Sequence, residues 1–313
     1  MVNTDILVAG ETLCDFFPVD EDGLRGQTFL RRPGGAPANV AVALGKLDCN
    51  PAVWSAVGRD QFGDDLVGTL QRAGCQTQLI ERSAQPTTLA MVDRSNDDFL
   101  FYRGADTTLS PDNLPESAVA AASWLVIGGV SLSSTPARVA IISLLDQANQ
   151  SGCSVFFDPN YRRELWEDFD FIETVRTVLP RVAVLSVTES ELQRIAPRET
   201  TAEERIASIL DQGPHTVCIT AGDEGARLIS SKKAPWGKKA VRHPGFTVQT
   251  VDTVGAGDAF NAGILWSLST GTMIPERLLA AGNAVAALST TDLGAMNGLP
   301  TPSEVMAFLD DQP

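Results

Sequence analysis

Short apolar runs alternate with longer amphipathic segments along most of the chain. Runs such as residues 6–9, 52–57 and 124–127 are continuously apolar and end at polar or glycine residues. This pattern is typical of strands that are buried on both faces. Segments with helical spacing of apolar residues occur in between, for example at residues 36–47 and 136–150. The alternation predicts a fold built from repeated strand–helix units.

The same alternation continues to the end of the chain. We predict further helices over residues 62–73, 171–179, 188–195, 201–211, 256–269, 274–290 and 303–309, and further strands over residues 154–157, 182–186, 216–220, 225–230 and 239–251. Repeated strand–helix connections favour a mainly parallel sheet with helices on both faces. The predicted fold class is therefore α/β, with residues 1–313 forming a single domain.

Two segments, residues 11–33 and 87–103, interrupt this alternation. Residues 87–93 and 98–103 have strand character and flank a polar turn at residues 95–97, which predicts a hairpin. Residues 11–33 are rich in Pro, Gly and acidic residues and carry no long helical period. We expect the two segments to form a small separate sheet.

Composition and charge limit the partners of this domain. With 43% hydrophobic and 20% charged residues, the 313-residue chain can bury a sizeable core. Its formal net charge of -15 argues against nucleic acid and anionic membranes as partners. Any site for an anionic ligand therefore needs local backbone N–H groups, a cation or an arginine. Lysine is scarce and acidic residues are abundant, a pattern that favours adaptation to high salt over an ordinary acidic protein.

Cysteine and histidine usage predicts a reducing, cytoplasmic location. The five cysteines form no CxxC pair, and with two histidines a disulfide framework or a zinc site is not expected. The first residues lack a basic segment, so we expect no signal peptide. The apolar run at residues 118–130 is too short to span a bilayer.

The strongest chemical signal lies at residues 252–260, Asp-Thr-Val-Gly-Ala-Gly-Asp-Ala-Phe. A glycine-rich turn that opens a helix presents unpaired N–H groups and the positive end of the helix dipole to an anion, such as a phosphate group. Asp258 follows in the first helical turn, where it could accept a proton from an attacking hydroxyl group. Phe260 stands where a dinucleotide fingerprint needs its third glycine, which excludes that alternative.

A second motif, Gly-Gly-Ala-Pro-Ala-Asn-Val-Ala at residues 34–41, accompanies the first one. Together the two motifs resemble the paired signatures of the ribokinase or phosphofructokinase-B family of sugar kinases, over about residues 6–309. The resemblance implies a ribokinase-like three-layer α/β/α fold with a small β-sheet lid, formed by the segments at residues 11–33 and 87–103. It also implies an ATP-dependent kinase that phosphorylates a sugar. A regulatory protein that kept the fold and lost the chemistry is the alternative from another class.

The resemblance also implies roles for individual residues. Asp258 would be the general base, Gly255, Ala256 and Gly257 would form the anion hole, and Arg162 would contact the phosphate or the substrate. The implied sugar-binding residues are Glu11, Asp15, Gly34, Gly35, Asn39, Arg103, Asp106, Asn160 and Asp258. The implied ATP-binding residues are Thr188, Thr220, Gly222, Gly225, Gly255, Gly257 and Asn283.

Two cation sites are implied in the same way. Glu191 would help to hold Mg²⁺, mainly through water, although Thr188 and Glu191 also have the spacing of a helix-capping box. Asp252 and Thr253 resemble part of the monovalent-cation site of many members, which would suit K⁺.

Three features make this chain similar to fructokinases within the family. They are Pro37, the opening segment at residues 10–16, and Ala105 with Asp106. Fructose is therefore the predicted substrate, and 2-keto-3-deoxygluconate is the alternative because the segment at residues 158–166 is shared with its kinases.

The lid segments also predict a homodimer. Their apolar residues are too numerous for a free-standing flap, so we expect them to be buried against the lid of a second subunit. These residues are Phe16, Phe17, Leu89, Met91, Phe99 and Phe101.

Overall fold

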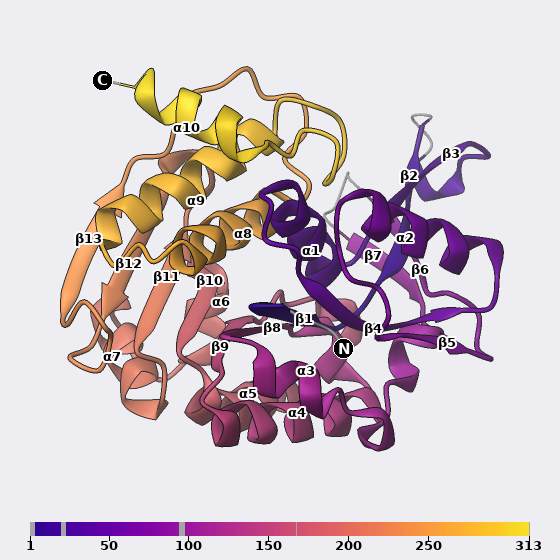
Figure 1. Cartoon of the computed structure of the whole chain (residues 1–313), viewed down its shortest axis with the longest axis horizontal. Helices are drawn as coiled ribbons and strands as arrows, with labels where there is room; N and C mark the ends of the chain where they lie inside the picture. Colours follow the sequence, from indigo (N-terminus) through magenta and orange to yellow (C-terminus); the bar gives the residue numbers. More distant parts are fainter. Residues whose placement is uncertain (1–3, 20–22, 94–97, 167, 313) are drawn as a thin grey trace.

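The computed structural model describes residues 4–19, 23–93, 98–166 and 168–312. It contains a nine-stranded sheet and a separate four-stranded sheet, with helices on both faces of the larger one (Figure 1). The three-layer α/β fold predicted from the sequence is thereby confirmed.

The large sheet has the strand order β13-β12-β11-β10-β9-β8-β1-β4-β5, and all neighbours from β11 to β5 are parallel. Its strands are β1 (Ile6–Ala9), β4 (Ala52–Gly58), β5 (Ile80–Ser83), β8 (Trp124–Gly128), β9 (Ser154–Asp158), β10 (Val184–Thr188), β11 (Thr216–Thr220), β12 (Ala226–Ser230) and β13 (Lys239–His243). Every residue of β1 and β4 is buried, as expected of strands covered on both faces.

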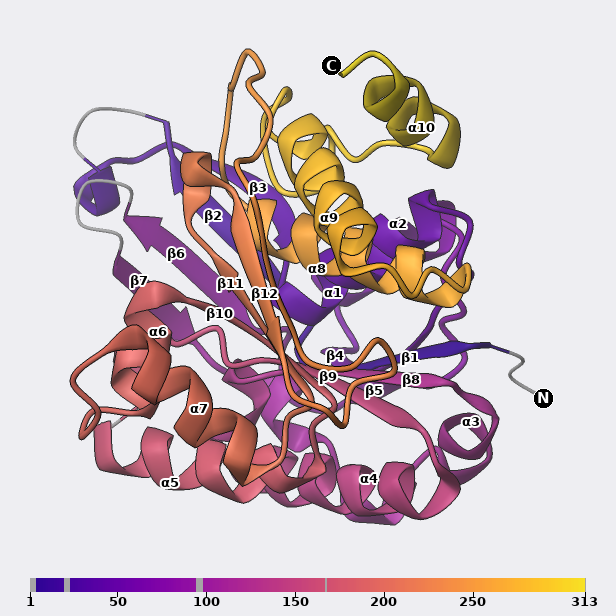
Figure 2. The same cartoon turned by 90° about the vertical axis from the view of Figure 1, so that its left-hand side faces the viewer.

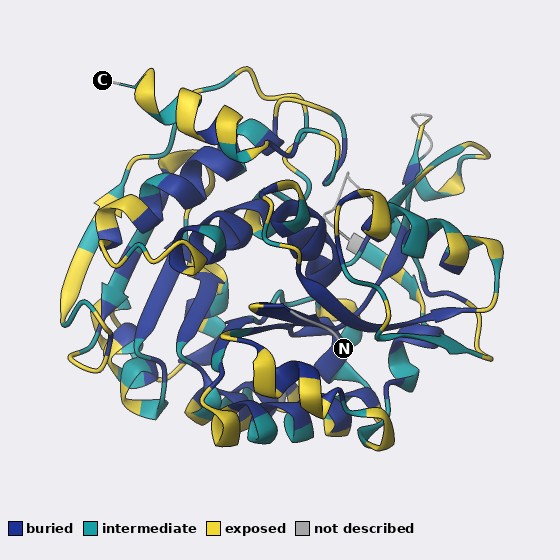
Figure 3. Ribbon diagram, in the orientation of Figure 1, coloured by how far each residue is buried: buried dark blue, intermediate teal, exposed yellow. Residues whose placement is uncertain are grey.

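Two groups of helices enclose this sheet (Figure 2). One face packs against α3 (Glu116–Ala121), α4 (Ala137–Ser151), α5 (Asp168–Val178), α6 (Glu189–Ile195) and α7 (Ala202–Gln212). The other packs against α1 (Ala36–Lys46), α8 (Ala256–Ser269), α9 (Pro275–Ser289) and α10 (Pro302–Asp310), with α2 (Gln61–Arg72) beside α1. The core consequently lies in two layers, one on each side of the sheet (Figure 3).

The small sheet is made of the two lid segments, as predicted. Its strand order is β3-β2-β6-β7, from β2 (Leu13–Pro18), β3 (Phe29–Gly34), β6 (Leu89–Asp93) and β7 (Asp98–Tyr102). The expected turn at residues 95–97 lies outside the described residues. Phe16 makes an edge-to-face contact with Phe62 of α2, 6.0 Å between ring centroids, so part of the lid packs on its own large domain.

One predicted strand is shorter than expected, because β13 ends at His243 and residues 244–250 have no regular structure. Pro244 lacks the N–H group that a ladder needs, and Gly245 adopts a left-handed φ of 81°, so the strand cannot continue. The structure also contains β5, which the apolar pattern did not predict because its sequence, Ile-Glu-Arg-Ser, is mostly polar.

Among the described residues, no helix is long and apolar enough to cross a membrane.

Candidate active site

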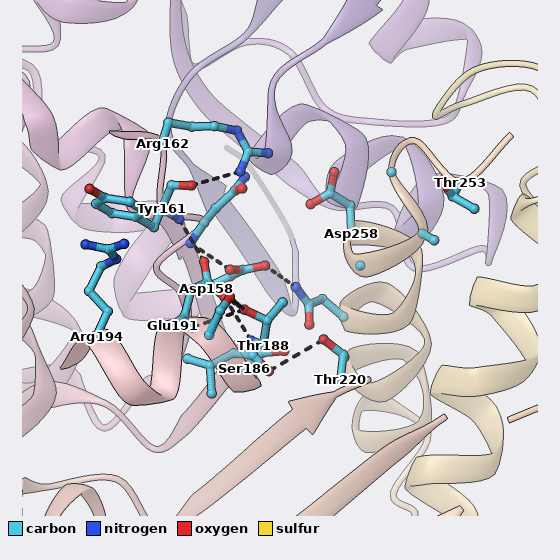
Figure 4. A pocket seen from close by; sticks show the side chains of 17 residues that line it. Asp158, Tyr161, Arg162, Ser186, Thr188, Glu191, Arg194, Thr220, Thr253 and Asp258 are labelled. Atoms are coloured by element: carbon cyan, nitrogen blue, oxygen red, sulfur yellow. Dashed lines mark hydrogen bonds between the residues drawn. The ribbon is translucent and has the colours of Figure 1, made fainter. Parts of the chain in front are cut away.

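A cavity of about 390 Å³ lies where three parallel strands of the large sheet end (Figure 4). β9, β10 and β11 end at Asp158, Thr188 and Thr220, and all three residues line the cavity. Ligands of open α/β sheets bind outside the carboxyl ends of the strands, which is where this cavity lies. The N-terminus of α8, residues 255–258, forms the opposite wall.

The glycine turn before α8 has the local geometry of an anion site. Gly255 caps the helix with a left-handed φ of 78°, and a Cβ atom there would lie 2.5 Å from Cβ of Ala295. Glycine is therefore required to bring the chain into the helix at this point. A Cβ atom on Gly257, by contrast, would meet nothing within 4 Å. The first N–H groups of α8 thus border open space in the cavity, where an anion can approach them.

Asp258 projects from this first turn, and its carboxylate accepts a hydrogen bond of 2.8 Å from Nδ2 of Asn39. Burial raises the pKa of Asp258 to about 6, although the bond from Asn39 and the positive charge of Arg162 both act to lower it. An acid with this pKa is ionised at neutral pH and still basic enough to take up a proton during a reaction. The structure therefore brings together Asp258 and Asn39 from two distant motifs.

The next part of the site is formed by the start of α1 and by β2. Burial raises the pKa of Asp15 to about 7, against the opposing effect of Arg162. A Cβ atom on Gly34 would lie 2.0 Å from Oδ2 of Asp15, and one on Gly35, whose φ is 98°, would lie 2.6 Å from the Glu11 carbonyl oxygen. Gly34 therefore lets the chain pass close to the Asp15 carboxylate that was predicted to bind the sugar, and Gly35 lets it pass close to the backbone of Glu11.

Glu11 lies deeper, with 1% of its surface exposed. It accepts a hydrogen bond of 2.6 Å from Oγ of Ser131, and burial raises its pKa to about 7. Arg103 donates to Asp106 at 2.7 Å and to Oγ of Ser133 at 2.9 Å.

Asp106 is fully buried and also accepts a hydrogen bond from Thr88 at the start of the lid strands. Glu11, Arg103 and Asp106 thus form a buried polar network at the base of the lid, and none of the three lines the main cavity among the described residues.

Asp158 is a residue of the cavity that the sequence did not identify as functional. Its carboxylate accepts hydrogen bonds from the N–H group of Asn160 at 2.9 Å and from Nδ2 of Asn261 at 2.7 Å. Burial raises its pKa well above the usual range, and the neighbouring carboxylates of Glu191 and Asp258 raise it further. Asn160 itself has a positive φ of 41°, which the hydrogen bond to Asp158 supports.

Glu191 has both of its carboxylate oxygens engaged. Oε1 accepts from the N–H group of Tyr161 at 2.8 Å, and Oε2 accepts from the N–H group of Thr188 at 2.8 Å. Thr188 and Glu191 form the capping box that their spacing predicted. Glu191 therefore also fixes the loop after β9 to the start of α6, which positions Asn160 and Arg162.

The three carboxylates around this cavity suit a hydrated cation. Glu191 and Asp258 both lie close enough to Asp158 for their negative charge to raise its pKa, and carboxylates clustered in this way favour a bound cation. Among the described residues, no group of three or more acidic, histidine or cysteine side chains forms a direct metal site. The residues fit Mg²⁺ that keeps much of its water shell.

Arg162 connects the lid to this cavity. Its guanidinium carbon lies 4.8 Å from the ring centroid of Phe99 on β7, and its Nη1 donates to the carbonyl oxygen of Tyr161 at 3.0 Å. The same guanidinium is near enough to lower the pKa of both Asp15 and Asp258. A positive charge in this position can stabilise negative charge that develops between the two carboxylates.

The residues predicted to bind the nucleotide are not all in one place. Thr188 and Thr220 line the cavity, whereas Gly222 and Gly225 lie in the turn after β11. Asn283 is buried in α9, where its side chain donates to the Leu279 carbonyl oxygen at 2.7 Å. Asn283 does not line the cavity, and its amide N–H already has a partner within the helix.

The segment predicted to hold a monovalent cation adjoins the glycine turn. Asp252 accepts hydrogen bonds from the N–H groups of Val254 at 3.2 Å and Gly294 at 2.9 Å, and Thr253 lines the cavity.

Seven residues that line the cavity were not predicted as site residues, namely Asp158, Tyr161, Ser186, Val187, Ser190, Arg194 and Asn261. Asn261 follows Asp258 by three residues on the same helical face, which is a signal that could have found it. The guanidinium carbon of Arg194 lies 4.1 Å from the ring centroid of Tyr161, so it stacks on the loop that carries Arg162.

Comparisons with known proteins identify the family and the fold of this chain. A model of the pfkB family of carbohydrate kinases matches residues 3–302. Fructokinase-2 of Zea mays is 34% identical over 316 residues, which cover 96% of this chain and 92% of that protein.

Two solved structures have the same fold along nearly their whole length. Fructokinase from Vibrio cholerae, solved with fructose, ADP and a calcium ion, has a TM-score of 0.86 and 29% identity, covering 98% of this chain and 99% of that chain. An Escherichia coli protein assigned as a ribokinase II, solved with ATP and Mg²⁺, has a TM-score of 0.89 and 25% identity, covering 99% and 100%.

Proposed function

Since the chain belongs to the pfkB family of carbohydrate kinases, we propose that it transfers the γ-phosphoryl group of ATP to a hydroxyl group of fructose. The observation that carries this proposal is the position of Asp258, a carboxylate in the first turn of a helix whose N–H groups face a cavity. Phosphoryl transfer to an alcohol needs a base for the hydroxyl proton and a fixed positive environment for the phosphoryl oxygens, and this turn supplies both.

Each residue of the site has a separate role in the phosphoryl transfer. Asp258 accepts the proton of the hydroxyl group as the hydroxyl oxygen forms its bond to the γ-phosphorus, while the bond to the β-phosphate oxygen breaks and ADP leaves. Asn39 holds the carboxylate in place through its 2.8 Å hydrogen bond. The N–H groups of residues 255–257 and the guanidinium of Arg162 stabilise the charge on the transferring group.

Asp15 and Asn39 supply oxygen and amide groups that can each bind neighbouring sugar hydroxyls. Mg²⁺, when bound, would neutralise charge on the β- and γ-phosphates, held near Asp158 and Glu191 mainly through water. Thr188 and Thr220 lie on the same wall of the cavity and would contact the nucleotide.

Fructose is the substrate because the fructokinase features of the sequence agree with the named relatives. A coupled assay for ADP release, run over fructose, 2-keto-3-deoxygluconate, ribose and a nucleoside, tests this. We expect the highest kcat/KM with fructose. A higher kcat/KM with 2-keto-3-deoxygluconate would identify the chain as a 2-keto-3-deoxygluconate kinase instead. No ADP release with any of these substrates would favour a regulatory role.

The pH dependence of activity should reveal the base. As the pH falls through about 6, Asp258 becomes protonated and kcat/KM should fall with it. The hydrogen bond from Asn39 lowers the pKa of Asp258, so Asn39→Ala should move this acidic limb to higher pH. Burial also raises the pKa of Asp15 to about 7, so the acidic limb of the native protein alone does not identify Asp258. The difference in pH between the limb of the native protein and that of Asn39→Ala identifies it. An acidic limb at the same pH in both would argue against Asp258 as the titrating base.

The requirement for Mg²⁺ should depend on Glu191. Glu191→Gln removes one anionic group beside the cavity, so we expect a higher Mg²⁺ concentration for half-maximal activity. Glu204→Gln is the matched control, because Glu204 closes the same kind of capping box at the start of α7. Equal Mg²⁺ titrations for the two variants would leave Glu191 with a capping role alone.

Asp252 and Thr253 are proposed to contribute oxygen ligands to a K⁺ site next to the glycine turn. Both oxygens of Asp252 accept backbone N–H groups, which would fix the carbonyl groups of this loop around the ion.

We also propose that the chain forms a homodimer through the lid. Of the lid residues predicted for this interface, Phe17 is buried and Phe16 and Leu89 pack within the chain. The exposed apolar residues are instead Leu100 and Tyr102, 47% and 59% exposed on β7, an edge strand of the small sheet. A two-fold interface with the lid of a second subunit would bury these apolar side chains and cover the edge strand. The scarcity of lysine and the acidic charge suit a cytoplasm of high salt, where screening reduces repulsion between the subunits.

Light scattering over a range of protein concentrations, in low and high salt, tests the dimer. We expect a dimer for the native chain and a monomer for the double variant Leu100→Lys with Tyr102→Lys. Met306→Lys, at a similarly exposed apolar position on α10, should remain dimeric. A monomeric native chain with full activity would contradict the proposal.

A further inference from the structure

Positive charge is concentrated in one hairpin of this acidic protein. Residues 226–243, which comprise β12, β13 and their connection, contain no Asp or Glu. The whole chain nevertheless has a formal net charge of -15. The basic residues of the hairpin are Arg227, Lys232, Lys233, Lys238, Lys239 and Arg242.

A groove of about 640 Å³ runs between this hairpin and α7. Both elements lie at the end of the large sheet that is far from the lid (Figure 1). Its apolar wall comes from Ile206 and Leu210 of α7 and from Ile229 and Ala240 of the hairpin. Ile229 and Ala240 are opposite each other in the β12–β13 ladder, so they form a continuous apolar floor. The volume is within the usual range for small-molecule sites, about 300–1,000 Å³.

The basic residues that line the groove differ in whether they form an ion pair with an acidic residue. Arg227 forms an ion pair with Glu189 at 2.6 Å, and Arg242 forms one with Glu224 at 3.7 Å. Lys232 and Lys238 also line the groove, at the connection between the two strands, and neither forms an ion pair with another described residue. Glu203 and Asp211 of α7 also line the groove, so its lining contains four basic and two acidic side chains and keeps an excess of positive charge.

Edge-strand lysines protect a sheet against unwanted pairing, and β13 is an edge strand. That role explains charge along the hairpin, but it does not require an apolar groove beside two of the lysines. The charge and the groove together suit a ligand with an anionic end and an apolar body.

We propose that this groove binds a free amphipathic anion, with an aliphatic or aromatic body on Ile206, Leu210 and Ile229 and a carboxylate or phosphate group between Lys232 and Lys238. The apolar body gains free energy by burial, and the charged end provides the specificity. The groove is separate from the cavity that contains Asp258, so this proposal does not depend on the proposed kinase reaction.

Calorimetric titration with decanoate, in the presence of a non-hydrolysable ATP analogue that occupies the main cavity, tests the proposal. The hairpin offers a matched pair of variants with the same change of net charge. Lys232→Glu with Lys238→Glu alters the lysines that line the groove, whereas Lys233→Glu with Lys239→Glu alters exposed neighbours that do not. We expect binding to be about tenfold weaker in the first variant, because two positive charges beside the anionic end of the ligand become negative. Binding should be nearly unchanged in the second variant.

A steric variant tests the apolar part separately. Ala207 is exposed on α7 and lines the groove, so Ala207→Trp should fill it and abolish binding while ADP release with the sugar stays normal. Equal weakening by both lysine pairs, or undiminished binding in Ala207→Trp, would overturn the proposal. Binding to vesicles of anionic lipid without binding to free decanoate would also overturn it, in favour of a membrane surface.

Discussion

Asp258→Asn should lose roughly 10²–10⁴-fold in kcat, the usual contribution of general-base catalysis, while the protein folds and binds ATP normally. The amide has nearly the shape of the carboxylate, and it cannot take the proton of the sugar hydroxyl group. Removing the charge should not destabilise the fold, since burial raises the pKa of Asp258 and therefore disfavours its charged form. Single-turnover measurement of sugar phosphate formation, with ATP affinity measured separately, checks both parts.

Asp64→Asn is the control for this variant. Asp64 also lies in the first turn of a helix, α2, but on the surface and away from the cavity. Its removal should leave kcat unchanged. Turnover near the native value in Asp258→Asn would remove Asp258 from the mechanism.

Gly257→Ala should have the second largest effect on activity. The new methyl group meets no protein atom within 4 Å, so thermal unfolding should be unchanged. It would, however, project into the space that the transferring phosphoryl group needs beside the first N–H groups of α8. A displacement of that group by about 1 Å can cost on the order of 10²-fold in rate, and we expect a loss of that order in kcat/KM.

Gly255→Ala, two residues earlier, separates this effect from ordinary destabilisation. Its methyl group would collide with Ala295 and its left-handed φ disfavours alanine, so the melting temperature should fall. Full activity of Gly257→Ala would show that the phosphoryl group does not approach this turn.

The site was predictable from the sequence where its parts are local. The glycine turn and Asp258 are neighbours in the chain, and turn geometry, helix dipole and base all follow from a few consecutive residues. The main sheet was predictable for a similar reason, because strands buried on both faces are continuously apolar. The capping box of Thr188 and Glu191 followed from spacing alone.

Other parts depend on which distant residues meet. Asp158 was not singled out, because its raised pKa arises from burial and from Glu191 and Asp258, which are far away in the chain. The family resemblance implied Asp106 as a sugar-binding residue, but its complete burial depends on Thr88 and Arg103. Sequence pattern gives burial along one element, but it does not give the neighbours that decide how a polar group is used.

The central claim is that Asp258 and the α8 turn transfer the γ-phosphoryl group of ATP to fructose. Incubation with ATP labelled in its γ-phosphate and with fructose, followed by separation of the products, tests it directly. We predict that the label appears in a fructose phosphate in a one-to-one ratio with ADP, and that Asp258→Asn forms this product far more slowly. Label found in inorganic phosphate alone, or equal rates for the two proteins, would contradict the account.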